Sequence, residues 1–281
     1  MTSQILETLR VTERPGLDGP KAPVVVLANG FCTSRASWDD VAAEIPAEWR
    51  VLRFEYVGSA GTSPEAWIPG RHTSMHGHAA DVVQMLRALE LRDVVFVGHS
   101  MSSMIGALVR VSAPELVKRL IMLGASPRFI DDVGYSGGFT QQAIDDLVSA
   151  ASVDLERWIG GFAPLALGEQ ASRAHLDRFI GNLLEMRPDI ALDMVRLVFQ
   201  LDVRREIPSV DCPVNLLQSQ FDVAVPPIVG VWLEKRLPNA TLEVLPVNGH
   251  VPQVTHPDVV SLRLNRILAQ LLAEGFGSTA H

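Results

Sequence analysis

The chain of 281 residues is long enough for one or two domains, and 47% of its residues are hydrophobic, with a mean hydropathy of +0.19, so it can bury a large core. A formal net charge of −8 without any lysine- or arginine-rich run argues against a nucleic-acid partner, because binding phosphates requires concentrated positive charge. The sequence shows no signal peptide and no apolar run of the ~20 residues that a membrane span needs, and Cys32 and Cys212 are too few for a disulfide framework or a zinc site, which together predict a cytoplasmic protein without membrane contacts.

Short apolar runs bounded by turn residues alternate with helix-like patterns along the chain. Such runs without polar alternation are typical of strands that are covered on both faces. Strands alternating with helices predict an α/β fold with a mostly parallel, doubly wound sheet. The predicted strands are Val24–Ala28, Val51–Phe54, Val94–Val97, Leu120–Leu123, Val214–Leu217 and Leu242–Leu245. The predicted helices outside the central region are Ala79–Leu89, Met101–Val111, Val229–Leu237 and Val259–Leu272.

One central region interrupts the alternation with four amphipathic segments and no convincing strand. The segments cover residues 141–151, 155–163, 171–186 and 188–202, and glycines and Pro188 punctuate them. We therefore expect a four-helix insertion, a lid at residues 135–204, within a core formed by residues 1–134 and 205–281, in a single domain overall. The last residues, GFGSTAH, are expected to form a loose tail.

The pentapeptide GHSMS at residues 98–102 joins a predicted strand to the following helix. A serine in this place, with glycine two residues before it, is typical of a nucleophile elbow. The turn would hold the Ser100 hydroxyl above the carboxyl ends of the strands, where open α/β sheets bind ligands. It would also leave the Met101 amide unpaired at a helix N-terminus. The alternative is a plain helix N-cap, for which serine is also favoured.

A serine hydroxyl becomes a nucleophile only when an oriented base takes its proton. His250 lies in a glycine-flanked loop after the strand Leu242–Leu245, and Asp222 follows the strand Val214–Leu217. Both residues are therefore expected at the same rim of the sheet as Ser100. The order serine, acid, histidine is the one that accompanies such an elbow in an α/β sheet. The sequence thus predicts the catalytic triad Ser100–Asp222–His250.

Other titratable residues compete for these roles. His99 adjoins the serine but points elsewhere in an elbow turn, His256 precedes a proline at the start of the last helix, and Asp211 precedes its strand. We expect His99 to pack beside the site and the other two to lie away from the chemistry. Three histidines in RHTSMHGH, residues 71–78, have no companion cysteine or acid, so a solvated loop is predicted there and no metal site.

Acyl transfer also requires hydrogen-bond donors aimed at the developing oxyanion. The Met101 amide is one predicted donor. The second is the Phe31 amide, in the loop that follows the strand Val24–Ala28, where Gly30 lets the backbone turn close to the site. A glycine loop after a strand can also hold phosphate, but no G-x-G-x-x-G or G-x-x-x-x-G-K-[ST] follows, so no nucleotide or other cofactor is predicted.

Further motifs accompany the elbow: ASPRF at residues 125–129, GGF at 137–139, Trp158 with GFAP at 161–164, MRPD at 186–189 and DVAVP at 222–226. With these motifs the chain resembles the α/β-hydrolases over nearly its whole length. More narrowly, it is similar to the group that holds the plant strigolactone and karrikin receptor hydrolases and the bacterial stress-response regulator hydrolases. That group also tends to carry serine at the last position of the pentapeptide, here Ser102.

The resemblance implies a V-shaped four-helix lid over a deep, mostly apolar pocket. The alternative is that the aromatic side chains of this region simply fill the interior of the lid. Two residues depart from the group: Asn29 stands where histidine is common, and Arg35 lies near the expected pocket mouth. These departures bear on the natural ligand more than on the reaction. The positions that match the pocket lining are Phe31, Phe139, Trp158, Phe162, Phe199 and Val251.

The leading hypothesis is a serine hydrolase that cleaves a small hydrophobic ester or lactone through an acyl-enzyme, without metal or organic cofactor. The second is a slow-turnover ligand sensor, in which a shift of the lid presents a surface to a regulatory protein partner, as the resemblance to signalling proteins implies. A third class is a cofactor-independent lyase, oxygenase or haloperoxidase on the same scaffold. Dehalogenases and epoxide hydrolases of that scaffold use an acidic nucleophile, whereas position 100 is serine.

Overall fold

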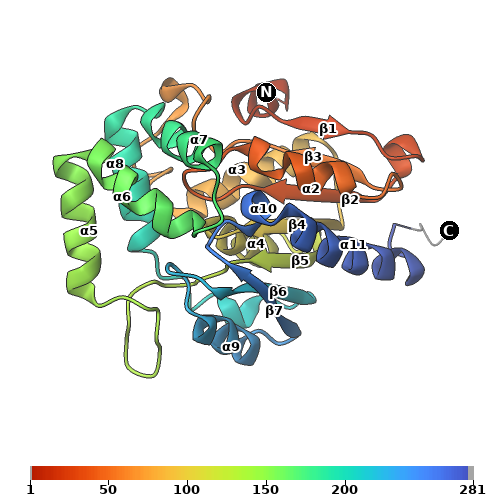
Figure 1. Ribbon diagram of the computed structural model, residues 1–281. Coiled ribbons are helices and arrows are strands. Elements are labelled where there is room, and N and C mark those ends of the chain that lie inside the picture. Colours follow the sequence, from red (N-terminus) through yellow and green to blue (C-terminus); the bar gives the residue numbers. More distant parts are fainter. Residues whose placement is uncertain (1, 278–281) are drawn as a thin grey trace.

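The protein is described over residues 2–277 by a computed structural model, in which seven strands form one sheet (Figure 1). The strands are β1 (Thr12–Arg14), β2 (Val24–Ala28), β3 (Arg50–Arg53), β4 (Val94–His99), β5 (Val117–Leu123), β6 (Val214–Phe221) and β7 (Ala240–Asn248). Their order in the sheet is β1-β3-β2-β4-β5-β6-β7. The edge strand β1 is antiparallel to β3, and every other pair of neighbours is parallel. The mostly parallel sheet that the sequence predicts is confirmed.

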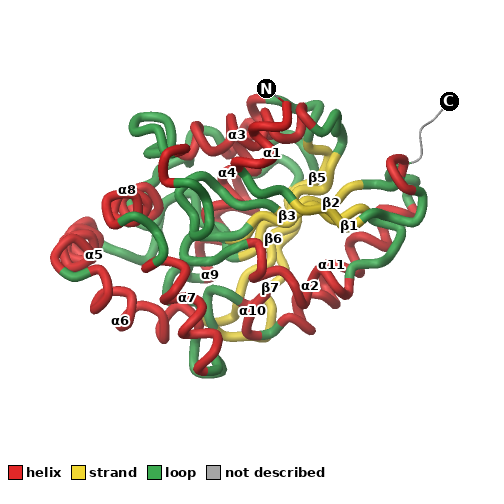
Figure 2. The backbone as a smooth tube through the Cα atoms, turned by 90° about the horizontal axis from the view of Figure 1, so that it is seen from above, coloured by secondary structure: helices red, strands yellow, loops and turns green. Residues whose placement is uncertain are grey.

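Helices cover both faces of this sheet. They are α1 (Thr2–Thr8), α2 (Asp39–Glu44), α3 (Met75–Ala88), α4 (Met101–Ser112), α5 (Gln141–Val153), α6 (Leu155–Leu167), α7 (Arg173–Leu184), α8 (Pro188–Phe199), α9 (Pro227–Arg236), α10 (Pro252–Thr255) and α11 (Pro257–Ala273). In the view of Figure 2, α3 and α4 lie on one side of the strands, and α2 and α11 lie on the other. The doubly wound arrangement predicted from the alternation of strands and helices is therefore confirmed.

The packing of the interior strand β2 shows why its sequence has no polar alternation. Val24 and Val26 pack into the larger hydrophobic cluster, which lies on the side of α3 and α4. Val25 and Leu27 pack into a second cluster on the opposite face, with residues of α2 and α11. All five β2 side chains are buried, and each Val or Leu contributes about 1.5–3 kcal/mol by leaving water. A polar residue at any of these positions would lose that contribution.

The carboxyl ends of the parallel strands are aligned at one edge of the sheet. Ala28, the last residue of β2, pairs with Gly98 of β4. His99 of β4 pairs with Leu123 of β5, which in turn pairs with Leu217 of β6. The loops that follow these strands therefore open on a common edge, which is where open α/β sheets bind ligands.

Four helices, α5 to α8, occupy the chain between β5 and β6 and are gathered on one side of the strands (Figure 1). Their starts are encoded locally. The side chains of Thr140, Asp154 and Ser172 each accept a hydrogen bond from the backbone amide three residues later, at the N-termini of α5, α6 and α7. Such caps satisfy amides that the helix itself leaves unpaired, so the region divides into separate short helices.

Several short elements have no counterpart in the sequence patterns, namely α1, β1, α2 and α10. The β1 strand is Thr-Glu-Arg, which contains no apolar residue, and α10 spans four residues; neither fills the window in which periodicity is recognisable. The predicted tail is only partly described: the Phe276 ring packs 5.5 Å from that of Trp49, whereas residues 278–281 lie outside the described residues. Between residues 2 and 277 no helix combines the length and hydropathy that crossing a bilayer requires.

Candidate active site

Ser100 stands at the junction of β4 and α4, with backbone angles φ 55° and ψ −120°. A positive φ costs a non-glycine residue about 1–3 kcal/mol, so the surroundings must enforce it. They do so through a 2.8 Å hydrogen bond from the Ser100 amide to the Leu123 carbonyl. At Gly98, a Cβ atom would lie 2.5 Å from the Ser102 backbone. Only glycine therefore allows the strand and the helix to approach so closely around the serine.

A continuous chain of hydrogen bonds connects the three residues proposed from the sequence as a triad. The Nε2 atom of His250 lies 2.8 Å from Ser100 Oγ, and its Nδ1 atom lies 2.8 Å from Asp222 Oδ2. The remaining carboxylate oxygen, Oδ1, accepts the amides of Ala224 at 2.8 Å and Val225 at 3.0 Å. With Nδ1–H donating to the carboxylate, Nε2 is left to accept the serine proton.

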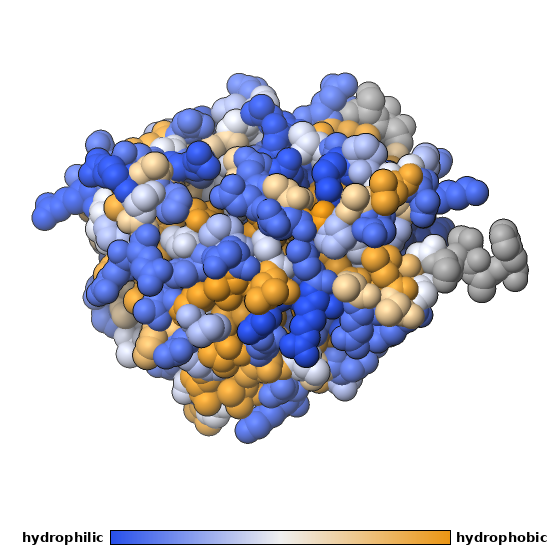
Figure 3. Space-filling view, turned by 45° about the vertical axis from the view of Figure 1, so that its right-hand side comes forward, coloured by the Kyte–Doolittle hydropathy of each residue, from blue (hydrophilic) through white to orange (hydrophobic). Residues whose placement is uncertain are grey.

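The side chain of Asp222 points inward, whereas its two neighbours in the turn are exposed hydrophobic residues. Phe221 is 63% exposed and Val223 53%, whereas Asp222 is 9% exposed. Exposed hydrophobic residues are a common feature of the surface. Figure 3 shows one face of the molecule, on which hydrophobic areas lie among hydrophilic ones and the largest hydrophobic area lies in the lower half. The inward direction of Asp222 follows from its hydrogen bonds to the two amides after it, which close the turn around the carboxylate.

His99 packs beside the site, where the sequence places it. Its ring lies 5.1 Å from the ring of His250, and its Nε2 atom lies 2.7 Å from the backbone carbonyl of His250. Burial, aided by the nearby His250, lowers the pKa of His99 to about 3, so its ring is neutral. The other competitors lie outside the triad: His256 contacts Gln170, and Asp211 pairs with Arg110 at 2.7 Å.

The loop that follows β2 approaches His99 closely. At Gly30, a Cβ atom would lie 2.4 Å from His99 Nδ1, so the loop reaches its position only because residue 30 is glycine. Its neighbour Phe31 is partly buried and packs against the main hydrophobic cluster. Met101 is the first residue of α4, so its amide has no intrahelical acceptor.

We expect Gly30→Ala to lower kcat and to destabilise the fold by about 1–3 kcal/mol, since the new methyl group must displace either the loop or the His99 ring. Ester hydrolysis and urea unfolding measure the two effects. The matched control is Gly160→Ala, because a Cβ at Gly160 in α6 meets nothing within 4 Å; it should raise stability by about 0.5–1 kcal/mol. Equal behaviour of the two variants would contradict the close approach.

A buried acid, Glu55, lies behind the same loop. It is 4% exposed, and its Oε1 atom accepts the Arg35 amide at 3.0 Å. Burial raises the pKa of Glu55 from 4.5 to about 7, although the hydrogen bond from Arg35 and the charges of Arg35 and Arg10 lower it. The sequence patterns do not single out this residue, because a lone acid after a strand carries no recognisable signal.

The raised pKa of Glu55 predicts a pH-dependent stability. Since the folded pKa lies above the unfolded one, the contribution of this group is fully present below about pH 4.5 and is lost as the pH rises through about 7. The loss amounts to about 3 kcal/mol, at 1.36 kcal/mol per unit. Glu55→Gln should abolish this pH-dependent loss of stability, so the variant should be more stable than the unsubstituted protein at pH 8. Urea unfolding at pH 5 and pH 8 measures this; an unchanged pH dependence in the variant would contradict it.

The helices between β5 and β6 are bonded directly to the loops of the site. The His250 amide donates to the carbonyl of Ala166, at the end of α6, over 2.6 Å. The Asn182 side chain in α7 donates to the Cys32 carbonyl over 3.2 Å. At Gly249, where φ is 95°, a Cβ atom would lie 2.4 Å from the Leu167 carbonyl. The end of α6 therefore lies in direct contact with the loop that carries the imidazole.

The aromatic side chains of these helices form a cluster. The rings of Trp158 and Phe162 stack at 5.2 Å, and the Phe162 ring meets that of Phe199 edge-on at 5.7 Å. Phe199 and Val251 are buried, and Phe139 is partly buried against the same hydrophobic cluster. Their role as pocket lining stays a prediction.

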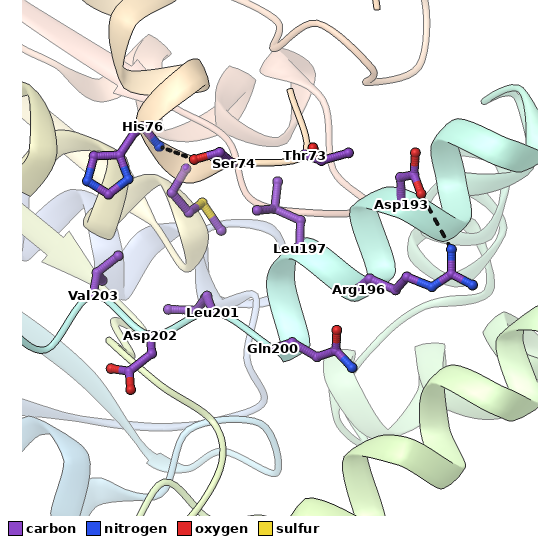
Figure 4. Close-up of a pocket in the computed structure, with 11 residues that line it drawn as sticks. Thr73, Ser74, His76, Asp193, Arg196, Leu197, Gln200, Leu201, Asp202 and Val203 are labelled. Atoms are coloured by element: carbon purple, nitrogen blue, oxygen red, sulfur yellow. Dashed lines mark hydrogen bonds and ion pairs between the residues drawn. The ribbon is translucent and has the colours of Figure 1, made fainter. Parts of the chain in front are cut away.

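A cavity of about 380 Å³ lies between the start of α3 and the end of α8 (Figure 4). It is lined largely by polar side chains, among them His76 and Gln200. Figure 4 shows Asp193 bonded to Arg196 at its edge. None of the triad residues contributes to this cavity, so it is distinct from the site built around the serine.

The prediction of a solvated loop at residues 71–78 is wrong for two of its three histidines. His72 is 2% exposed; its Nδ1 atom accepts the Ile68 amide at 2.8 Å, and its Nε2 atom lies 3.0 Å from Asp81. His78 is fully buried, and burial lowers its pKa to about 4. The acidic partner, Asp81, lies farther along the chain in α3, and no local pattern links it to His72. Among the described residues, no group of three or more His, Cys, Asp or Glu side chains is placed to hold a metal ion.

Comparison with known proteins assigns this chain to a family. The family model described as alpha/beta hydrolase fold matches residues 23–257. The chain belongs to the α/β-hydrolase family. The predicted fold class is thereby confirmed.

This α/β-hydrolase is similar to plant proteins of the group that its motifs indicate. It is 35% identical to Karrikin insensitive 2 receptor CA of Petunia hybrida, over 86% of this chain and 90% of that protein. It is 34% identical to Strigolactone esterase D14 of Arabidopsis thaliana, over 94% of this chain and 97% of that protein. A solved structure of a hydrolase from Oleispira antarctica superimposes with a TM-score of 0.91 at 25% identity, over 95% and 97% of the two chains. The predicted resemblance to the α/β-hydrolases and to the plant strigolactone and karrikin proteins is therefore confirmed, and the protein is an enzyme of the hydrolase class.

Proposed function

We propose that this hydrolase cleaves a small hydrophobic ester or lactone with Ser100 as nucleophile, His250 as base and Asp222 as the residue that orients the base. The observation that carries the proposal is the hydrogen-bond chain from Ser100 Oγ through both imidazole nitrogens to the Asp222 carboxylate, with 2.8 Å at each step. A serine hydroxyl that is hydrogen-bonded to an oriented imidazole is the arrangement that nucleophilic acyl transfer requires. The esterase name of one relative points to the same chemistry.

In the proposed reaction, Ser100 Oγ attacks the substrate carbonyl while His250 Nε2 takes the hydroxyl proton. The negative charge that develops on the carbonyl oxygen is met by the amides of Phe31 and Met101, and losing one such donor costs about 10²–10³ in kcat in serine hydrolases. The imidazolium, held by Asp222, then gives its proton to the leaving alkoxide. A water molecule, activated by His250, hydrolyses the acyl-enzyme.

The substrate class rests on the surroundings of Ser100. The helices α5 to α8 belong to the proposed lid, residues 135–204, and bring an aromatic cluster to the side of the sheet on which the loops of the site open. An apolar enclosure with few polar groups favours small hydrophobic molecules. A lactone fits the same reaction, since it is a cyclic ester, and strigolactone appears in the name of one relative.

Labelling with a fluorophosphonate tests the nucleophile directly. The proposal predicts one phosphonyl adduct per chain, on Ser100, with loss of activity in proportion to labelling. Peptide mass mapping distinguishes Ser100 from Ser102 and Ser103 in the same helix start. An adduct on either neighbour, or activity that survives complete labelling, would rule out Ser100 as the nucleophile. A panel of esters and lactones is then added in competition with the label, and the compounds that slow labelling define the substrate class.

A second candidate function is a ligand sensor with slow turnover and a regulatory protein partner. Two observations favour it: one relative is named a receptor, and the His250 amide is bonded to the insertion at Ala166, so a ligand that moves α6 also acts on the base. Turnover near 10 per second, a typical enzyme rate, favours a metabolic esterase. Turnover slower by orders of magnitude, with a protein captured only in the presence of a lactone, favours the sensor.

A further inference from the structure

The two proposed oxyanion donors lie on different segments, and a hydrogen bond joins these segments. Met101 begins α4, whereas Phe31 belongs to the loop after β2. Ser102, the residue after Met101, donates its hydroxyl to the backbone carbonyl of Asn29, two residues before Phe31. Ser102 and Asn29 are both 0% exposed, so water does not compete for this bond.

Asn29 also closes the loop from its other side. Its Nδ2 atom donates to the Thr33 carbonyl at 2.8 Å, and the Thr33 hydroxyl donates to the Gly30 carbonyl at 2.8 Å. Cys32, which directly precedes Thr33 in this loop, takes a positive φ of 59°. The peptide between Gly30 and Phe31 is therefore held by the hydroxyl of Thr33. The Thr33 carbonyl accepts from the Asn29 side chain, and the Asn29 carbonyl accepts from Ser102.

Resting on the proposed function, we propose that Ser102 and Asn29 are positioning residues that set the spacing of the two oxyanion donors. Neither side chain touches the reacting atoms. Ser102 holds the loop at a fixed distance from α4, and Asn29 passes that constraint to the Phe31 peptide. An oxyanion hole is sensitive to such spacing, because its donors must lie about 2.7–3.1 Å from the oxygen that they stabilise.

The proposal accounts for two residues that depart from common patterns. Glycine is the usual last residue of the elbow motif. At position 102 it would leave the Asn29 carbonyl without the hydrogen bond that the Ser102 hydroxyl donates here. Asn29, at a position where the resemblance described above implies histidine, supplies an amide donor that reaches Thr33 within its own loop. The two residues thus form one unit, in which the serine of the helix and the asparagine of the loop act together.

Ser103 provides a matched control in the same helix turn. It is also a buried serine, at 1% exposure, and its hydroxyl donates to a backbone carbonyl, that of Gly98, at 2.7 Å. This bond stays within the β4–α4 unit and does not reach the loop of Phe31. Removing either hydroxyl therefore costs a similar buried bond, but only removal of the Ser102 hydroxyl frees the loop.

The test compares Ser102→Ala, Asn29→Asp and Ser103→Ala in hydrolysis of a chromogenic acetate ester. We expect the first two variants to lose about 10–100-fold in kcat with little change in KM, less than the loss of a whole donor. The affinity for a boronic acid, whose tetrahedral adduct on Ser100 resembles the intermediate, should fall by the same factor. Ser103→Ala should lower the melting temperature like Ser102→Ala but keep kcat close to that of the unsubstituted protein.

The double variant Ser102→Ala/Asn29→Asp tests whether the two residues act as one unit. If they do, its kcat loss equals that of the worse single variant, whereas independent residues give multiplied losses. Undiminished kcat in Ser102→Ala, or equal kcat losses in Ser102→Ala and Ser103→Ala, would overturn the proposal. Failure of the proposed function would give a different result, namely turnover that persists in Ser100→Ala. The variants of Ser102 and Asn29 do not test that function.

Discussion

Ser100→Ala is expected to lower kcat for a chromogenic acetate ester by about 10⁵–10⁶-fold, as loss of the nucleophile does in serine hydrolases. The substitution removes only the hydroxyl that lies 2.8 Å from His250 Nε2. Alanine accepts the backbone angles of residue 100 at about the same cost as serine, since both have a Cβ atom. The melting temperature should therefore stay nearly constant while activity is lost. Initial rates and thermal unfolding of the same preparation measure both quantities.

The control for this variant is Ser152→Ala. Ser152 lies exposed in α5, where its hydroxyl bonds the Ser149 carbonyl, so its removal should leave kcat unchanged. A Ser100→Ala protein that folds and still hydrolyses the ester at the rate of the control would exclude the proposed mechanism.

Asp222→Asn is expected to lower kcat by about 10⁴-fold at neutral pH, the size of the effect in the serine-protease triad. The reason lies in the two amides of Ala224 and Val225, which bond Asp222 Oδ1. They will hold the amide oxygen of asparagine in that place and turn its NH₂ group toward His250 Nδ1. The imidazole then accepts at Nδ1 and carries its proton on Nε2, where it cannot take the proton of Ser100.

The matched control is Asp211→Asn, which changes the other acid close to β6. Asp211 is exposed and pairs with Arg110, so its loss should leave kcat unchanged. If the tautomer argument holds, Asp222→Asn retains KM and its melting temperature while kcat falls. A similar small effect of both substitutions would show that Asp222 does not orient the base.

The residues of the candidate triad could be found from the sequence because each follows a strand whose apolar run is easy to recognise. In a parallel sheet the loops after such strands share an edge, so Ser100, Asp222 and His250 could be placed together without knowing the strand order. The short elements β1 and α10 have no periodic signal, so sequence patterns do not reveal them. Their positions depend on pairing and packing with distant parts of the chain.

Side-chain partners were the part of the site that sequence patterns could not supply. The sequence places His72 in solvent because its partner Asp81 belongs to the following helix. The bend that brings the two residues together has no local signature. The bond from Ser102 to Asn29 joins residues 73 positions apart. Glu55 is recognisable as unusual only once its burial is known. Local propensity identifies which residues end a strand, whereas tertiary packing decides what they touch.

The hydrogen bond from the His250 amide to the Ala166 carbonyl ties the backbone of the imidazole to the helical insertion. Lifting the end of α6 either leaves that amide without its acceptor or draws the ring away from Ser100. If the proposed mechanism holds, we expect a bulky substrate that keeps α6 away from the His250 loop to be cleaved more slowly. On the same proposal, the rate of hydrolysis would depend on the width of the substrate as well as on the reactivity of its carbonyl.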